Sequence, residues 1–201
     1  MANKLVSYIL TVSGLVGLFG CQHQPRTPEE LAEYARQPEH GLVQQRQVGD
    51  VDIRVQYRPT DLLVAQELNG STDQKQIAVL REKYDRYAYF ILSFSQDNKG
   101  ALYQQANHER FSETLQNLAF RMDRFVQVTS ARQDTIPLLD SAFPRLYGHG
   151  SNTPVMLVFD RAKFPDRGPV RLTVADVGLG TGRQQFVFDA RNLRQAPRVF
   201  E

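Results

Sequence analysis

The sequence has no tryptophan and only four histidines among its 201 residues. Without tryptophan, a carbohydrate site in which indole rings stack on sugars is disfavoured. The histidines lie far apart, and none forms the HxxxH or HxH spacing that zinc sites commonly use. They are His23, His40, His108 and His149. We therefore predict no metal site and no cofactor.

A recognisable nucleophile for covalent catalysis is also missing. No serine stands in a GxSxG elbow, and the single cysteine, Cys21, directly follows an apolar N-terminal stretch. Scattered aspartates and glutamates could come together in space as an acid and a base, as they do in glycosidases, but their order along the chain does not show this. The sequence thus predicts no catalytic residue.

The chain lacks an excess of charge of either sign. Lys4 is the only charged side chain among the first 20 residues, so the rest of the chain carries 23 basic and 22 acidic side chains. A formal charge of +1 attracts neither nucleic acid nor anionic lipid to the chain as a whole. We therefore expect no nucleic-acid partner.

The first 21 residues carry the strongest pattern that is present. Lys4 precedes a mostly apolar run over 5–18, which ends in Leu18-Phe19-Gly20-Cys21. A positive start, an apolar core and a small residue at the cut are typical of a secretory signal. A membrane-spanning helix needs about 20 predominantly apolar residues, and this run is shorter. We therefore interpret residues 1–20 as a signal peptide that is removed.

Leu18-Phe19-Gly20-Cys21 resembles the lipobox of bacterial lipoproteins, a resemblance that covers only the signal. It implies that diacylglycerol is attached to the thiol of Cys21, that the chain is cut before Cys21, and that the new amino terminus is acylated with a fatty acid such as palmitate. Two or three chains would anchor a domain stably, because each buried methylene contributes about 0.8 kcal/mol. An alkylated Cys21 forms no disulfide. The alternative is that Cys21 is an ordinary small residue after a plain signal peptide.

The residue after Cys21 indicates the membrane to which a lipoprotein is delivered. In some Gram-negative bacteria an aspartate at this place signals retention in the inner membrane, and this chain has Gln22 instead. The resemblance therefore implies a lipid-anchored protein of the cell envelope, at the outer membrane. Either leaflet of the outer membrane is compatible with this pattern.

The remainder of the chain suggests a tether and one domain. Residues 21–26 are polar and contain Pro25, so we expect a short lipidated tether. Residues 27–201 are enough for a single globular domain with a sizeable core. Apolar periodicity predicts strands over 42–48, 51–57, 89–95, 125–128, 155–159, 170–174 and 185–188. Capping residues predict helices that begin after Thr27, Ser71 and Asn107, and a further helical stretch is predicted from Thr60 to Leu68.

The order of these elements predicts the fold class. Strands and helices do not alternate regularly, and the last three strands follow one another, so we predict an α+β domain with a mainly antiparallel sheet and helices packed on one face. The alternative is a β-sandwich with helical insertions. Residues 135–154 mix prolines and glycines with apolar residues, which predicts a long, partly buried connection.

This connection contains a candidate site. Arg145, Tyr147 and His149 are interleaved with Leu146, Gly148 and Gly150. Tyrosine and histidine can donate, accept or shuttle protons, and arginine binds anions. One hypothesis is that these three residues, with Asp134 and Asp140, line a ligand or partner site. The other hypothesis is a solvated glycine-rich loop.

Apolar residues near the same connection allow a partner surface. Large apolar patches on folded domains often mark interfaces. We expect Phe143, Tyr147 and Phe164 either to form such a surface or to cap the core.

The glycine-rich stretch 178–182 follows a predicted strand, as phosphate-binding loops do. A phosphate-binding loop opens a helix, however, and the residues that follow this stretch predict another strand. The Walker lysine and the dinucleotide spacing are also missing. We therefore predict a connection between two strands, in which glycines supply positive φ angles.

The lipobox and the lack of a catalytic motif together favour a non-enzymatic envelope protein that binds another envelope protein or stabilises an assembly. One alternative is a tethered protein that binds a small ligand or a glycan through 135–154, which a concave pocket there would favour. The third hypothesis is a hydrolase whose catalytic carboxylates belong to no recognisable motif. Two close carboxylates with raised pKa values in a cleft would indicate it.

Overall fold

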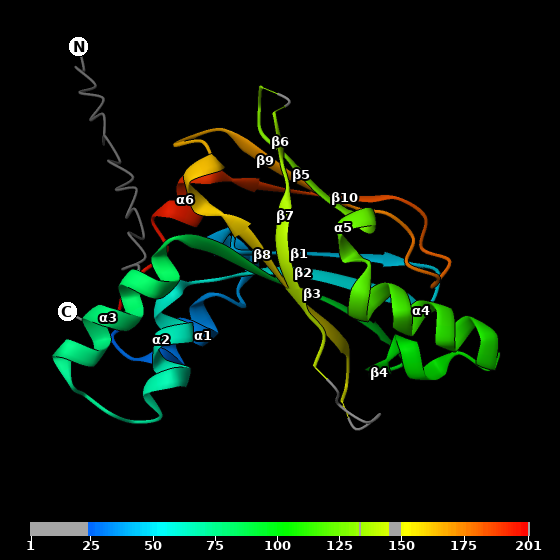
Figure 1. Ribbon diagram of the computed structural model, residues 1–201, viewed down its shortest axis with the longest axis horizontal. Coiled ribbons are helices and arrows are strands. Elements are labelled where there is room, and N and C mark those ends of the chain that lie inside the picture. Colours follow the sequence, from blue (N-terminus) through cyan, green and yellow to red (C-terminus); the bar gives the residue numbers. More distant parts are fainter. Residues whose placement is uncertain (1–23, 133, 145–149, 201) are drawn as a thin grey trace, which may run out of the picture.

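The computed structural model describes residues 24–132, 134–144 and 150–200 (Figure 1). Cys21 and the candidate residues Arg145, Tyr147 and His149 lie outside these ranges, so the predictions about them stay predictions. No helix within the described ranges has the length and apolar character needed to cross a membrane.

The described chain contains short helices and strands in an irregular order, with several strands in succession. The helices are α1 (Pro28–Tyr34), α2 (Thr60–Leu68), α3 (Gln74–Asp85), α4 (His108–Phe120), α5 (Met122–Phe125) and α6 (Ala190–Arg194), and the 3-10 helices are η1 (Pro38–His40), η2 (Ala101–Gln104) and η3 (Arg161–Lys163). The strands are β1 (Val43–Val48), β2 (Val51–Arg58), β3 (Tyr87–Gln96), β4 (Lys99–Gly100), β5 (Val126–Thr129), β6 (Thr135–Ile136), β7 (Leu138–Ala142), β8 (Thr153–Asp160), β9 (Pro169–Val174) and β10 (Gln184–Asp189).

The strands form two antiparallel sheets. The first has the order β1-β2-β3-β8-β7, with β4 beside the end of β3, and the second has the order β10-β9-β5-β6. The α+β class and the antiparallel pairing are thereby confirmed. The structure has two sheets instead of the expected single sheet. In this respect it resembles the alternative prediction, a β-sandwich with helical insertions.

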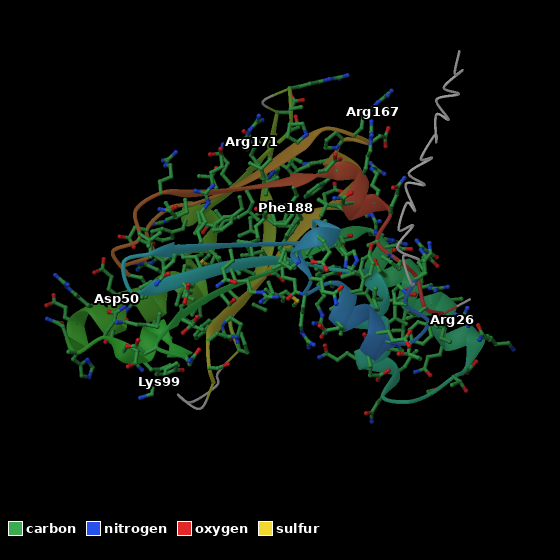
Figure 2. All side chains as sticks on the ribbon, turned by 180° about the vertical axis from the view of Figure 1, so that it is seen from behind. Arg26, Asp50, Lys99, Arg167, Arg171 and Phe188 are labelled. Atoms are coloured by element: carbon green, nitrogen blue, oxygen red, sulfur yellow. The ribbon has the colours of Figure 1, made fainter. Side chains whose placement is uncertain are left out.

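The two sheets face one another because each presents an apolar face to the other, although helices also cover part of the outer face of the first sheet. Side chains of β2, β9 and β10 alternate between buried and at least partly exposed positions along each strand. A sheet with one apolar face needs a cover, and two such faces cover one another. Phe90 of β3 lies with its ring centroid 5.4 Å from that of Phe188 of β10. Figure 2 shows Phe188 between the sheets.

Helices occupy both ends of this sandwich. Figure 1 shows α1, α2 and α3 grouped at one end and α4 at the other. The first group lies on the outer face of the first sheet, where Gln56 of β2 donates a hydrogen bond to the carbonyl oxygen of Ala35 (3.0 Å). The expectation that helices cover one face of a sheet therefore holds for this group, whereas α4 lies at the other end of the sandwich.

Local sequence determines where the helices begin. The Thr27 hydroxyl accepts the Glu30 N–H (3.2 Å), and the Asn107 side chain accepts the N–H groups of Glu109 and Arg110. These two caps agree with the predictions. The helix predicted after Ser71 is capped by Asp73 instead, whose carboxylate accepts the Lys75 N–H (2.9 Å).

The prediction that 135–154 is a connection without strands is wrong. The segment contains β6, which belongs to the second sheet, and β7, which pairs with β8 at the edge of the first sheet. The chain thus crosses from one sheet to the other at Pro137. An edge strand is paired on one side only and buries few residues, so β7 lacks the regular alternation that identifies a strand in sequence.

The C-terminal tail packs against a second, smaller hydrophobic core. α2 and α3 pack together around Val64, Leu68, Ile77 and Leu80, and Phe200 packs against this cluster. Asp61 of α2, which is 1% exposed, accepts the N–H groups of Val199 (2.8 Å) and Phe200 (3.2 Å). The tail is therefore held by a buried carboxylate.

Candidate functional site

An open cleft of about 650 Å³ lies where the ends of α3, β3, β8 and α6 meet the edge strand β7. We call it the Tyr87 cleft. Its lining consists of Asp85, Arg86, Tyr87, Leu139, Asp160, Arg161, Ala162 and Arg194.

Two exposed apolar side chains share this cleft. Tyr87 is 36% exposed and Leu139 is 50% exposed, and only three other large apolar side chains are classed as exposed among the described residues. Those three are Val79, Phe120 and Val187, none of which lines the cleft. Single exposed apolar residues are normal on a protein surface, whereas two that share a concave surface indicate a binding site.

A β-bulge accounts for the exposure of Leu139. In the pairing of β7 with β8, Leu138 is opposite Phe159 and Asp140 is opposite Val158, so Leu139 is an extra residue without a partner. Bulges bend the strand and redirect a side chain, and they are frequent beside functional sites. The bulge thus places Leu139 at the cleft instead of in the core.

Tyr87 is supported by a second tyrosine. Its ring centroid lies 6.2 Å from that of Tyr89, at an interplanar angle of 75°, and Tyr89 in turn contacts Tyr84 of α3. Burial, with smaller contributions from Tyr84 and Tyr87, raises the pKa of Tyr89 to about 12. The Tyr89 hydroxyl stays protonated at neutral pH, as that of an ordinary tyrosine does, and the Tyr89 ring contacts those of Tyr84 and Tyr87.

A network of arginines surrounds Asp85. Arg161 donates to the Asp85 carboxylate (3.3 Å) and to the Thr60 hydroxyl (3.4 Å), and Arg198 donates to the other oxygen of Asp85 (3.0 Å). One carboxylate is thus shared by two guanidinium groups. This leaves a positive charge that Asp85 does not balance.

The two outer arginines are positioned differently. Arg194 donates to the carbonyl oxygens of Pro165 (3.1 Å) and Phe164 (2.8 Å), which fixes its side chain against the neighbouring loop. The Arg86 side chain bonds only to the exposed Glu82 (2.9 Å) among the described residues, and it is 67% exposed. The cleft therefore combines held and exposed cations with an apolar centre, an arrangement suited to an acidic and apolar partner.

The sequence-predicted site is only partly within the described residues. Asp134 lies in the turn between β5 and β6, where its carboxylate accepts the Ser130 hydroxyl (3.5 Å). Asp140 lies in β7, and its carboxylate accepts the N–H of Ser141 (2.8 Å). The two aspartates thus belong to different sheets and to separate local hydrogen bonds.

The partner surface predicted around Phe143, Tyr147 and Phe164 is wrong for Phe164. This side chain is 6% exposed and its ring lies 6.2 Å from those of Phe90 and Phe159. Phe143 is half-buried against the same core. The alternative, that these residues cap the core, is correct for both phenylalanines, and Tyr147 lies outside the described residues.

The glycine-rich stretch is a connection between β9 and β10, as predicted. Gly178, Gly180 and Gly182 have positive φ angles. The Asp176 carboxylate accepts the N–H groups of Gly178 (3.0 Å), Leu179 (2.9 Å) and Gly180 (3.1 Å). These backbone amides, which a phosphate would need, are therefore already bound to a side chain of the protein.

The cleft residues were not among the predicted site residues. One signal was available: Leu138 and Leu139 are adjacent and apolar, and adjacent side chains of a strand point to opposite faces. A strand there would have to expose one of them. The arginines gave no signal, because they come from the C-cap of α3, from η3 and from α6 and meet only in the fold.

Comparisons with known proteins give two similar structures. No protein-family model matches the chain, and no curated protein matches it. A DUF4426 family protein from Pseudomonas aeruginosa PAO1 is 12% identical, with a TM-score of 0.36 over 74% of this chain and 92% of that chain. A protein of unknown function from Burkholderia pseudomallei K96243 is 11% identical, with a TM-score of 0.38 over 85% and 93%. Neither likeness carries an argument about function.

Proposed function

We propose that the chain is a lipid-anchored protein of the cell envelope, held at the outer membrane through Cys21, and that its domain docks a partner protein in the Tyr87 cleft as a non-enzymatic component of an assembly. The observation that carries this proposal is the shared exposure of Tyr87 and Leu139 in a concave surface lined by arginines. Tyrosine and arginine are enriched among the residues that contribute most to binding at protein interfaces.

The charge of the cleft favours a partner of a definite chemistry. Arg86, Arg161 and Arg194 line the cleft with Asp85 and Asp160; Asp85 is shared by Arg161 and Arg198, while Arg86 pairs with Glu82 and Arg194 with Asp166, both of which are exposed. The docking segment therefore presents an apolar side chain to Tyr87 and Leu139 and an aspartate or glutamate to the arginines. Opposite charges across an interface steer the encounter and reject partners of the wrong sign.

A lipid on Cys21 would keep the cleft close to the membrane. Residues 21–26 span at most about 20 Å when extended. The described chain enters the fold through α1, which Figure 1 shows at the same end as α3, and α3 supplies part of the cleft. This placement supports a partner that lies in or beside the same membrane.

Lipidation is tested by the mass of the protein. We expect the chain purified from envelopes to begin at Cys21 and to carry diacylglycerol and an N-linked fatty acid, because the lipobox directs both modifications. A Cys21→Ser chain should keep residues 1–20 and carry no lipid. Identical processing of the two chains, or a wild-type chain without lipid, would contradict the anchor.

Docking is tested by site-specific photo-cross-linking of the full chain in cells. With a photoreactive amino acid at position 87 or 139, we expect an adduct with the same protein, because both side chains line one cleft. The matched control is position 187, where the exposed Val187 lies in β10 outside the cleft. Peptide mapping should place the adduct in a segment with an acidic residue next to an apolar one.

A substitution separates docking from chance proximity. Leu139→Ser should weaken the adduct at position 87 by about tenfold, the effect of losing roughly 1.4 kcal/mol of binding energy, whereas Val187→Ser should not change it. Both side chains are exposed, so both variants should keep the thermal midpoint of the wild type. Equal cross-linking from positions 87, 139 and 187, or equal effects of the two substitutions, would refute the docking site.

The second candidate function, a tethered protein that binds a small ligand, can be tested with the same variants. The cleft volume of about 650 Å³ lies within the range of small-ligand sites, and Leu139 belongs to the segment 135–154 in which a pocket was expected. A tethered ligand-binding protein would give no protein adduct at position 87. Instead, an anionic ligand would raise the thermal midpoint of the wild type and of Val187→Ser more than that of Leu139→Ser.

A further inference from the structure

A second hollow, of about 440 Å³, lies between the turn that joins β5 to β6 and the loop that follows η3. Three cations line it, Arg132 from the turn and Lys163 and Arg167 from η3 and the loop. All three side chains belong to exposed residues. We call this hollow the basic groove.

The three cations have no partner among the described residues. Their side chains form no ion pair and no hydrogen bond with any residue of the ranges that the structure describes. The groove also contains Asp166 and Asp134, but Asp166 pairs with Arg194 (3.1 Å) and Asp134 accepts the Ser130 hydroxyl (3.5 Å). The groove therefore holds three cations against one carboxylate, Asp134, that no described cation pairs with, and positive charge predominates there.

The turn that carries Arg132 is held by its own hydrogen bonds. The N–H of Ser130 donates to the carbonyl oxygen of Asp134 (3.0 Å). The hydroxyl of Ser130 accepts the backbone N–H of Arg132 (3.2 Å). The backbone at Arg132 is thus fixed without the use of its side chain, which remains available to a ligand.

The opposite wall is held in a similar way. Arg194 donates to the carbonyl oxygens of Phe164 and Pro165, the Phe164 ring is buried in the core, and the Gly168 carbonyl accepts the Ala190 N–H (2.9 Å). Gly168, with a φ of +93°, faces Ala131, since a Cβ there would lie 3.7 Å from the Ala131 Cβ. The two walls therefore touch beside the cations.

We propose that the basic groove binds a phosphate group. Guanidinium groups offer planar pairs of donors that match phosphate oxygens, and the lysine adds a compact positive charge. The phosphate belongs either to the headgroup of an anionic lipid or to a soluble phosphate compound, since the chemistry recognised is the same. This inference does not rest on the Tyr87 cleft, and its test uses none of the cleft residues.

The test follows the acetylation rate of Lys163 in the full chain, held in micelles of a neutral detergent and read by mass spectrometry. Inorganic phosphate at about ten times its dissociation constant should slow the reaction about tenfold. Sodium chloride of equal ionic strength should have a much smaller effect. Lys99 is the internal control, because it is exposed and Figure 2 shows it on the opposite side of the molecule from Arg167.

Substitutions identify the groove as the cause of protection. Arg132→Gln and Arg167→Gln should each raise the dissociation constant about tenfold, because each removes a charge-assisted hydrogen bond. The matched control is Arg171→Gln on β9, outside the groove, which should have no effect (Figure 2). All three side chains are at least partly exposed, so unchanged circular dichroism would show that the variants fold.

A second arm separates the two sources of phosphate. The full chain is reconstituted into vesicles of phosphatidylcholine, with or without phosphatidylglycerol. Protection of Lys163 by inorganic phosphate in micelles indicates a soluble compound, and protection only by phosphatidylglycerol indicates a lipid headgroup. Equal acetylation under all conditions, or protection that survives both arginine substitutions, would overturn the proposal.

Discussion

Replacing Asp61 with alanine is expected to lower the free energy of unfolding by about 3–5 kcal/mol, the usual cost of breaking a buried ion pair from one side. The Asp61 side chain is 1% exposed and accepts hydrogen bonds from Arg81 Nε (3.0 Å) and Nη2 (2.8 Å). It also accepts the backbone N–H groups of Val199 and Phe200. Alanine removes the acceptor for all four groups at once and detaches the tail from α2.

Two measurements check this expectation. Urea unfolding of the full chain gives the loss of stability, and hydrogen exchange should show the amides of Val199 and Phe200 exchanging faster while those of β3 stay protected. The control is Glu67→Ala, because Glu67 also pairs with a cation, Lys83, but at an exposed position. An Asp61→Ala chain as stable as this control would contradict a structural role for the carboxylate.

The same carboxylate should make stability depend on pH. Burial raises the pKa of Asp61, but hydrogen bonds from Arg81, Val199 and Phe200 outweigh burial and hold the pKa below its ordinary value of 3.8. The unfolded chain therefore binds the proton more tightly, so the contribution of Asp61 is complete above that value and is lost as pH falls through it. Between about pH 6 and pH 3, the wild type should lose more stability than Asp61→Asn.

Replacing Phe90 with alanine should also cost about 3–5 kcal/mol, the range for deleting a buried aromatic ring. Phe90 is fully buried, and its ring contacts Tyr57, Phe159, Phe164 and Phe188 at centroid distances of 5.3–6.2 Å. Its partners come from both sheets and from the loop after η3. The cavity left by alanine would therefore loosen the contact between the sheets as well as one strand.

Urea unfolding with a matched control measures this effect. Phe120→Ala makes the same chemical change at a side chain that is 80% exposed, so it should alter stability by less than about 0.5 kcal/mol. Phe90→Leu should fall between the two, because leucine fills part of the space. Equal stabilities of Phe90→Ala and Phe120→Ala would show that the sheets do not depend on this ring.

The elements that sequence patterns predicted correctly depend on neighbours along the chain. Asn107 caps α4 through amides two and three residues away. Gly49, with a φ of +58°, lies in the two-residue turn that joins β1 to β2 as a hairpin. Strand β3 shows its central position in its own composition, because a strand covered on both faces is apolar throughout. Such features need no knowledge of the rest of the fold.

The patterns failed where pairing or burial depends on distant segments. The strand β7 exists because β8 offers it a free edge, and its own residues show little alternation. The balanced total charge gave no sign of the basic groove, because a net charge of +1 says nothing about where cations gather in space. The Tyr87 cleft likewise combines the ends of elements that lie far apart in the chain.

By itself, the sequence determined the starts of α1 and α4, the β1–β2 hairpin and the α+β class, and it carries the pattern on which the lipid anchor is predicted, because each depends on residues close together in the chain. Only the tertiary structure decided that two sheets face one another, that Asp61 holds the tail, and that arginines surround Tyr87 and Leu139. These features join residues separated by tens of positions, and long-range packing alone selects which of them meet.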